Sequence, residues 1–283
     1  MSTVPQIVTS VAELRHRIKA LRQDDARVGL VPTMGALHAG HLSLVREIQK
    51  HVDVVVVSIF VNPTQFAPHE DFDAYPRALM ADAQKLGGAG ETDLVFAPSA
   101  SEMYPAGFAT KVEVGGPASG LETVTRPHFF AGVATVVSKL LLAVGPDVAM
   151  FGEKDYQQLM VIRRMVADLG LGVQILGAPI VRESDGLAMS SRNAYLSEAE
   201  RAVAGQFNVV LKRLIAKLRD SAAIAEIEAD GAQALLAAGF HSVDYVAVRD
   251  AESLAPLTTL DRPARILAAA TIGKTRLIDN MAV

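Results

Sequence analysis

The chain of 283 residues contains no cysteine, and it has no excess of basic side chains. The first absence excludes disulfide bonds, zinc sites built from thiolates and cysteine nucleophiles. Lys and Arg together number 27 against 31 Asp and Glu, so the formal net charge is −4. Without an overall positive field, non-specific nucleic-acid binding is a poor hypothesis. We therefore expect no nucleic-acid partner.

Long apolar runs are also missing, although 50% of the residues are hydrophobic. A membrane-spanning helix needs about 20 uninterrupted apolar residues. The longest candidate, residues 133–144, is interrupted by Lys139. The N-terminal sequence MSTVPQIVTS lacks the basic flank and the apolar stretch of a secretory signal. We therefore expect a cytoplasmic protein with no membrane partner.

Two kinds of pattern divide the chain, and neither contains an internal repeat or a low-complexity tract. Short β-branched runs alternate with helical patterns over the first part, which is typical of βαβ units around a parallel sheet. The strands predicted there are 28–31, 54–60, 93–96, 147–151 and 172–176, and the helices are 11–22, 41–51, 77–86, 133–143 and 156–169. In the second part, helices at 197–219 and 222–238 precede strands at 242–249, 265–270 and 274–278. We expect an α/β domain over residues 1–181 and a smaller α+β domain over residues 182–283.

The loop after the first predicted strand, PTMGALHAGH, has the features of an anion site. Ligands of an open parallel sheet bind beyond the carboxyl ends of its strands. Gly35 permits a tight turn, and His38 and His41 lie on either side of Gly40 where a helix begins. The helix N-terminus favours an anion, and Gly40 leaves room for it to approach. Zinc is the weaker hypothesis, because the i,i+4 spacing of HExxH and a third ligand are missing. The remaining alternative is two ordinary structural histidines.

Polar side chains also follow the later strands of the predicted sheet. Asn62 and Gln65 in FVNPTQF, and Gln158 in FGEKDYQQ, are uncharged amides suited to a hydroxyl or carboxylate of a small substrate. For FVNPTQF, the alternative interpretation is a simple proline turn with Asn at its start. Lys154 would bring an ammonium group to the same edge of the sheet, although a lysine in a loop is more commonly just solvated.

The segment VRESDGLAMSSRN, at the junction of the two predicted domains, offers groups that suit phosphate oxygens. Ser190 and Ser191 supply two hydroxyls, and Arg192 supplies a guanidinium that can bind in a bidentate manner. Asn193 and Ser197 can be read as ordinary turn and cap residues. The chain has no Walker A sequence and no GxGxxG fingerprint, so any phosphate chemistry differs from that of P-loop and dinucleotide-binding proteins.

Taken together, these segments carry a resemblance to a known family. The HxGH-type helix start and the serine/arginine loop resemble the nucleotidylyltransferase superfamily. The full strings PTMGALHAGH, FVNPTQF, FGEKDYQQ and VRESDGLAMSSRN, followed by DYVAVRDAESL and LIDN, resemble the pantothenate synthetase family in particular. The resemblance implies an ATP-dependent ligase that condenses pantoate with β-alanine to pantothenate, AMP and pyrophosphate, on the route to coenzyme A. An enzyme-bound pantoyl adenylate is the implied intermediate.

The same resemblance implies Mg²⁺, a homodimer, a Rossmann-like N-terminal domain and a C-terminal domain that closes over ATP. Gln65 and Gln158 match the glutamines that hold pantoate, and Gln65 also matches a position near β-alanine. The residues implied in catalysis are His41, the usual proton donor, together with His38, Lys154 and Arg192. The implied ATP-binding residues are Met34, Gly35, Ala36, Leu37, His38, Ala39, Gly40, His41, Gly152, Glu153, Lys154, Asp155, Val181, Met189, Ser190, Ser191 and Arg192.

Two positions limit the match. His128 directly follows Pro127, where many members have a glycine between them, so the path of this loop is open. Asp82 lies where some members place an acid near magnesium. We predict no protein ligand for the metal, because magnesium generally binds through ATP phosphates and water.

Two alternative functions remain at this point. One is another HxGH nucleotidylyltransferase, which would need a cationic site for a second phosphate where this sequence has amides. The other is a non-catalytic nucleotide sensor, against which the intact His38, His41, Lys154 and Arg192 argue.

Overall fold

The structure, a computed structural model, describes residues 4–66, 72, 77–89, 92–220 and 223–283, and it divides into two compact units. Unit 1 comprises Met1–Gly115, Arg126–Glu153 and Val161–Pro179. Unit 2 comprises Gly116–Thr125, Lys154–Met160 and Ile180–Val283, so two short stretches from the middle of the chain belong to it. The boundary between residues 181 and 182 stays a prediction. Residue 222, the expected start of one helix, lies outside the described residues.

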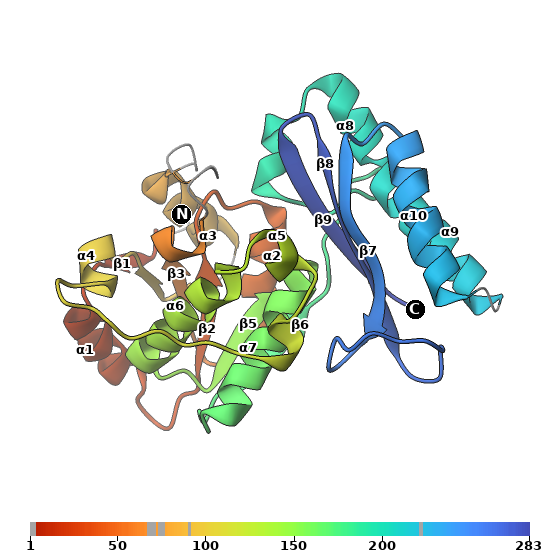
Figure 1. Ribbon diagram of the computed structural model, residues 1–283. Coiled ribbons are helices and arrows are strands. Elements are labelled where there is room, and N and C mark those ends of the chain that lie inside the picture. The colour runs from red at the N-terminus through yellow and green to blue at the C-terminus, as the bar shows by residue number, and fades with distance from the viewer. Residues whose placement is uncertain (1–3, 67–71, 73–76, 90–91, 221–222) are drawn as a thin grey trace. The chain divides into compact units, whose positions relative to one another are not determined.

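Unit 1 is built on a six-stranded parallel sheet in the order β1-β4-β3-β2-β5-β6 (Figure 1). Its strands are β1 (Gln6–Val8), β2 (Val28–Thr33), β3 (Val54–Ile59), β4 (Leu94–Phe96), β5 (Val148–Gly152) and β6 (Gln174–Ala178). The five strands predicted from the sequence are all present. The three-residue strand β1 was missed because it is too short to show a period. The order of the strands reverses between β2 and β5, which makes this the switch point of the sheet.

Helices cover this sheet because its central strands are apolar throughout. In β3, five of the six residues are buried, as expected for a strand with packed layers on both faces. One core cluster joins β2, β3 and β5 to helices α2 (Ala39–Ile48) and α3 (Leu79–Ala89). Helix α6 (Phe129–Val144) packs against β2 and α1 (Val11–Leu21). The further helices of this half of the chain are α4 (Ala100–Met103), α5 (Glu122–Thr125) and α7 (Tyr156–Asp168).

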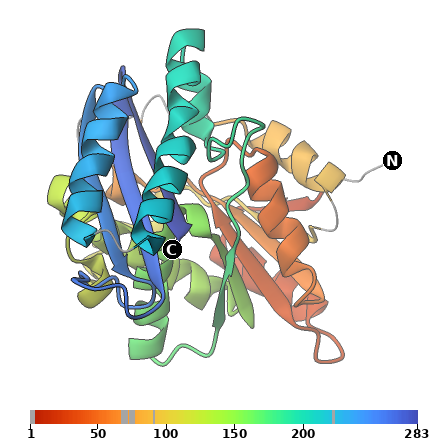
Figure 2. The same ribbon diagram turned by 90° about the vertical axis from the view of Figure 1, so that its right-hand side faces the viewer.

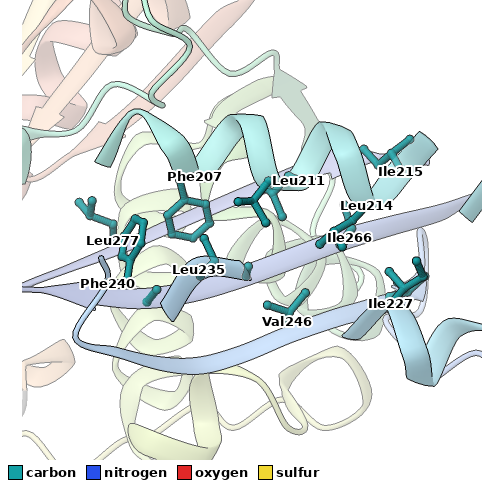
Figure 3. Close-up of a cluster of buried hydrophobic side chains, with 14 of the residues drawn as sticks. Phe207, Leu211, Leu214, Ile215, Ile227, Leu235, Phe240, Val246, Ile266 and Leu277 are labelled. Carbon is teal, nitrogen blue, oxygen red and sulfur yellow. The ribbon is translucent and has the colours of Figure 1, made fainter. Parts of the chain in front are cut away.

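Unit 2 is an α+β unit, as the sequence predicted. Its antiparallel sheet consists of β7 (Ser242–Asp250), β8 (Ala264–Ile272) and β9 (Thr275–Ala282) in that order. Helices α9 (Gln206–Arg219) and α10 (Ile224–Ala237) lie side by side on one face of this sheet (Figure 2). Side chains such as Phe207, Leu211 and Leu235 fill the space between helices and strands (Figure 3).

The single helix predicted over residues 197–219 is two helices. Helix α8 (Glu198–Ala204) ends at Gly205, and α9 begins at the next residue. A Cβ at Gly205 would lie 2.7 Å from Oδ2 of Asp185, which forms an ion pair with Arg201 of α8. Gly205 itself keeps helical dihedral angles, with φ −60° and ψ −23°, so the interruption is short and helical periodicity does not reveal it. Among the described residues, none of the helices is both long and apolar enough to cross a bilayer.

Candidate active site

Three of the sequence motifs follow three adjacent strands of the parallel sheet. FVNPTQF follows β3, PTMGALHAGH begins with the last two residues of β2, and FGEKD begins with the last two residues of β5. These are the carboxyl ends of strands at and beside the switch point, where open parallel sheets bind ligands. The residues of these motifs up to Glu153 belong to unit 1, whereas Lys154–Met160 and the serine/arginine loop belong to unit 2.

The two histidines of PTMGALHAGH form the N-terminal cap of α2. Nδ1 of His38 accepts a hydrogen bond from the N–H of Gly40 at 3.1 Å, and Nδ1 of His41 accepts one from the N–H of His38 at 3.3 Å. The two ring centroids are 4.1 Å apart. An accepting nitrogen of a neutral imidazole carries no proton, so these contacts place the proton of each ring on Nε2. The structural and functional interpretations are thus compatible, because the capping bonds orient two Nε2–H donors at a helix N-terminus.

The tight turn expected at Gly35 is present. Gly35 has a φ of +84°, and Ala36, which follows it, has a φ of +51°. A Cβ at position 35 would lie 3.1 Å from Oδ2 of Asp82, so both conformation and space favour glycine. Strand β2 therefore turns sharply before α2 begins.

The amides after β3 form a hydrogen-bonded group in the interior of unit 1. Asn62 is 1% exposed and Gln65 is 9% exposed. Nδ2 of Asn62 donates to Oε1 of Gln65 at 3.1 Å and to the carbonyl of Gly132 at 3.3 Å. Nε2 of Gln65 in turn donates to Sδ of Met34 at 2.9 Å, which connects this group to the histidine motif. Asn62 thus orients Gln65.

Two members of this group were missed in the sequence. The hydroxyl of Tyr104 donates to Oδ1 of Asn62 at 2.7 Å, and burial raises the pKa of Tyr104, so the hydroxyl keeps its proton. Gly132 of α6 lies so close to the turn after β3 that a Cβ there would be 2.4 Å from the carbonyl oxygen of Thr64. Neither residue lies near the motif in sequence, so no local pattern could have identified it.

The path of the chain before α6 is now visible. His128 occupies the N-cap position of α6 without a side-chain capping bond. The guanidinium of Arg126 lies 3.8 Å from the ring centroid of Phe129 and donates to the carbonyl of Gln65 at 3.1 Å. The segment around His128 therefore packs beside the amide group through Arg126.

In unit 2, the two consecutive glutamines of FGEKDYQQ have different environments. Gln157 is 3% exposed, and its amide donates to the carbonyls of Pro117 and Gly120 at 3.0 and 3.2 Å. Its Oε1 accepts the N–H of Glu122 at 3.2 Å. Gln158 is only partly buried, on the first turn of α7. Gln157 thus fixes the 116–125 segment, which leaves Gln158 as the candidate ligand.

The segments around Val181 and Met189 pair with each other. The N–H of Met189 donates to the carbonyl of Val181 at 3.0 Å, and Arg182 forms an antiparallel bridge with Ala188. These bonds close a hairpin over residues 182–188. Directly after it, Oγ of Ser190 accepts the N–H of Arg192 at 3.3 Å and caps the short helix Ser191–Tyr195.

Two residues of the LIDN sequence in β9 hold the 182–188 hairpin and the segment at Lys154, and they do so from opposite faces of the strand. Asp279 binds the guanidinium of Arg182 through two contacts of 2.7 and 2.9 Å, which fixes the hairpin. Asn280, the next residue, donates to the carbonyl of Lys154 at 2.9 Å and accepts from Nε of Arg265 at 2.5 Å. Successive strand side chains point to opposite faces, so two neighbouring residues hold two candidate nucleotide-binding segments.

A second ion-pair group, formed by Arg276 of the same strand β9, holds the 116–125 segment. Arg276 binds both oxygens of Glu122 at 2.8 and 2.9 Å, and the hydroxyl of Tyr245 donates to Glu122 at 2.7 Å. Burial and the neighbouring Glu122 carboxylate raise the pKa of Tyr245 well above its usual value. Burial opposes the charge of Arg276, but the bonds and charge of Glu122 outweigh it, and the pKa of Arg276 is raised. The segment is therefore held by a charged arginine and a protonated tyrosine.

Over the described part of the chain, no group of three or more His, Asp or Glu side chains is arranged to hold a metal ion.

Comparison with known proteins gives a family for the whole chain. The sequence profile described as Pantoate-beta-alanine ligase matches residues 6–282. The pantothenate synthetase of Paramagnetospirillum magneticum is 57% identical over 283 residues, covering 100% of this chain and 99% of that protein. The pantothenate synthetase of Mesorhizobium japonicum is 55% identical, covering 99% and 98%.

Solved structures agree with the sequence comparison. Pantothenate synthetase from Thermus thermophilus has a TM-score of 0.91 and 47% identity, with 98% of each chain covered. Pantoate-beta-alanine ligase from Francisella tularensis, complexed with beta-gamma ATP and beta-alanine, has a TM-score of 0.82 and 34% identity, covering 98% of this chain and 97% of that one. The resemblance carried by the motifs is thereby confirmed, and the chain belongs to the pantoate–β-alanine ligase family.

Proposed function

We propose that this ligase activates pantoate with ATP as an enzyme-bound pantoyl adenylate, which β-alanine then converts to pantothenate with release of AMP. Pyrophosphate leaves in the first step. The observation that carries the proposal is the pairing of two Nε2–H histidine donors with an uncharged amide group that packs against the same turn, through Met34. Hydrogen-bond donors suit phosphate oxygens, whereas neutral amides suit a carboxylate that must remain a nucleophile.

For the first step we assign the phosphates to His38 and His41. Both pantoate and ATP are anions, so their approach requires groups that offset the repulsion. The Nε2–H groups and the N-terminus of α2 offer such donors without a covalent intermediate. We assign the larger contribution to His41, whose interaction strengthens as charge develops on the departing pyrophosphate.

We assign pantoate to Gln65 and Gln158, and the β-alanine position to the neighbourhood of Gln65. The support for Gln65 is its fixed orientation by Asn62. The support for Gln158 is that its neighbour Gln157 is already bonded on both its amide nitrogen and its oxygen. Amides orient the carboxylate without neutralising it.

The remaining ATP contacts are proposals that rest on the family motifs. They comprise Met34 to His41, Gly152 to Asp155, Val181, and Met189 to Arg192, with Lys154 and Arg192 as cationic partners of the phosphates. The bond between Met189 and Val181 supports a shared role for these two positions. A homodimer, a cytoplasmic location and closure of the second domain over ATP are further predictions from the resemblance.

Magnesium would arrive as a complex with ATP, where it neutralises phosphate charge. We propose that phosphate oxygens and water hold it, since the carboxylate oxygens of Asp82 already accept backbone N–H groups of the turn before α2. We therefore assign no protein ligand and no separate step to the metal.

AMP and pantothenate formation tests the proposal. The complete mixture of ATP, Mg²⁺, pantoate and β-alanine should yield both products in equal amounts, and omission of pantoate should abolish AMP. A nucleotidylyltransferase for a phosphorylated substrate would release pyrophosphate without AMP, and a nucleotide sensor would do neither. Either outcome would refute the proposal.

A further inference from the structure

Asp82 of α3 is a buried carboxylate with an unusual pair of partners. Its side chain is 1% exposed. Oδ2 accepts the N–H of Ala36 at 2.8 Å, and Oδ1 accepts the N–H of Leu37 at 2.9 Å. Burying a carboxylate is costly unless it is paired and hydrogen-bonded. Here its bonds go to the backbone of the turn between β2 and α2.

That turn needs external support. Gly35 and Ala36 both have positive φ, and for Ala36, which carries a Cβ, the left-handed conformation is unfavourable. The N–H groups of Ala36 and Leu37 precede the cap residue His38, so α2 gives them no partners. Asp82 supplies those partners.

Lys85 supports the same turn from the next turn of α3. Its Nζ donates to the carbonyl of Leu37 at 2.8 Å and lies 3.5 Å from Oδ1 of Asp82. Leu37 is thus held at its N–H by Asp82 and at its carbonyl by Lys85. The next residue in the chain is His38, the cap of α2.

We propose that Asp82 is a positioning residue, which holds the left-handed turn at Gly35 and Ala36 and thereby sets the orientation of the His38 and His41 rings. The proposal rests on the function proposed above for these histidines. It differs from a role as a magnesium ligand, because both carboxylate oxygens face backbone amides and almost none of the side chain reaches solvent.

The sharpest test is a double-mutant cycle, which compares Asp82→Asn, Ala36→Gly and the variant that carries both substitutions. Asn has the shape of Asp but presents an NH₂ group to one of the two backbone N–H groups. We expect Asp82→Asn to lower kcat/KM for ATP by about 10- to 100-fold, with little change in the KM for pantoate. Glycine adopts positive φ without strain, so the double variant should recover activity relative to Asp82→Asn.

A second readout needs no substrate. Nitrogen NMR of the histidine side chains should show Nε2–H tautomers for His38 and His41 in the wild type, and a mixed population in Asp82→Asn. Because it is measured without turnover, this result stands even if the proposed reaction fails. The matched control is Asp147→Asn, whose Oδ2 accepts the N–H of Val28 at the opposite end of β2. Asp147→Asn should lower the free energy of unfolding without changing the histidine NMR signals or the KM for ATP.

Three results would overturn the proposal. One is unchanged kinetics and histidine signals in folded Asp82→Asn. Another is an activity loss that excess Mg²⁺ restores, which indicates a metal ligand. The third is a double variant whose activity is no higher than that of Asp82→Asn. If Asp82→Asn does not fold, Lys85→Met removes the bond to the Leu37 carbonyl and the ion pair with Asp82, but leaves both bonds from Asp82 to the backbone in place, so it should give a smaller loss in the same direction. Wild-type kinetics and histidine signals in Lys85→Met would then contradict the proposal.

Discussion

The ion pair between Asp279 and Arg182 should contribute strongly to the stability of unit 2. The Asp279 side chain is 1% exposed, the Arg182 side chain is 22% exposed, and two contacts of 2.7 and 2.9 Å join them. Removing one partner of a buried pair costs about 3–5 kcal/mol. Asn at position 279 keeps one accepting oxygen, so we expect Asp279→Asn to lower the free energy of unfolding by about 3 kcal/mol, at the lower end of that range. Urea unfolding measures this change.

A double variant separates stability from positioning. Replacing a buried pair by apolar side chains is often neutral, so Arg182→Met with Asp279→Leu should recover part of the stability that Asp279→Asn loses, although the bonds of the pair to neighbouring backbone groups are also removed. The KM of the double variant for ATP should be about tenfold above the wild-type value. The reason is that Arg182 also donates to the carbonyls of Gly186 and Asn280, and these bonds are lost. As a control, Asp261→Asn removes an exposed ion pair with Arg262 and should change neither quantity. Full stability in Asp279→Asn, or a wild-type KM for ATP in the double variant, would refute this reasoning.

Four further substitutions test the assignments in unit 1 and α7. His41→Ala should lower kcat by about 10²–10³, with a much smaller change in ATP affinity, because its bond strengthens as pyrophosphate departs; near-wild-type turnover would remove it from the mechanism. Gln65→Ala and Gln158→Ala should each weaken pantoate binding by about 1–3 kcal/mol in calorimetry, and a loss of ATP affinity instead would reverse the assignment. Gly132→Ala should destabilise unit 1 by about 1–3 kcal/mol through overpacking and raise the KM for pantoate, whereas Gly172→Ala, with no atom within 4 Å of its new Cβ, should change neither.

The sequence predicted the features that depend on local pattern. The uninterrupted apolar run of β3 placed it at the centre of a parallel sheet, and β3 pairs with both β2 and β4. The rule that ligands bind at the carboxyl ends of such strands then directed attention to the histidines and to Gln65. These predictions needed only a period, a strand end and the chemistry of the side chains.

Features that depend on long-range contacts were beyond the sequence. Tyr104 reaches Asn62 across 42 positions, and Asp279 reaches Arg182 across 97. Nothing local marks either partner. In the sequence, Asp82 matches only a position where some family members have an acid near magnesium, whereas its bonds to the backbone of Ala36 and Leu37 depend on the fold.

The acyl-adenylate intermediate is the central claim, and isotope exchange tests it most directly. If the carboxylate of pantoate attacks ATP, the first step needs ATP, Mg²⁺ and pantoate but no amine. Labelled pyrophosphate should therefore enter ATP when pantoate is present and β-alanine is absent. Exchange that requires β-alanine would indicate a single-step condensation, and exchange without pantoate would indicate a covalent enzyme intermediate. Either result, obtained with active enzyme, would contradict the account.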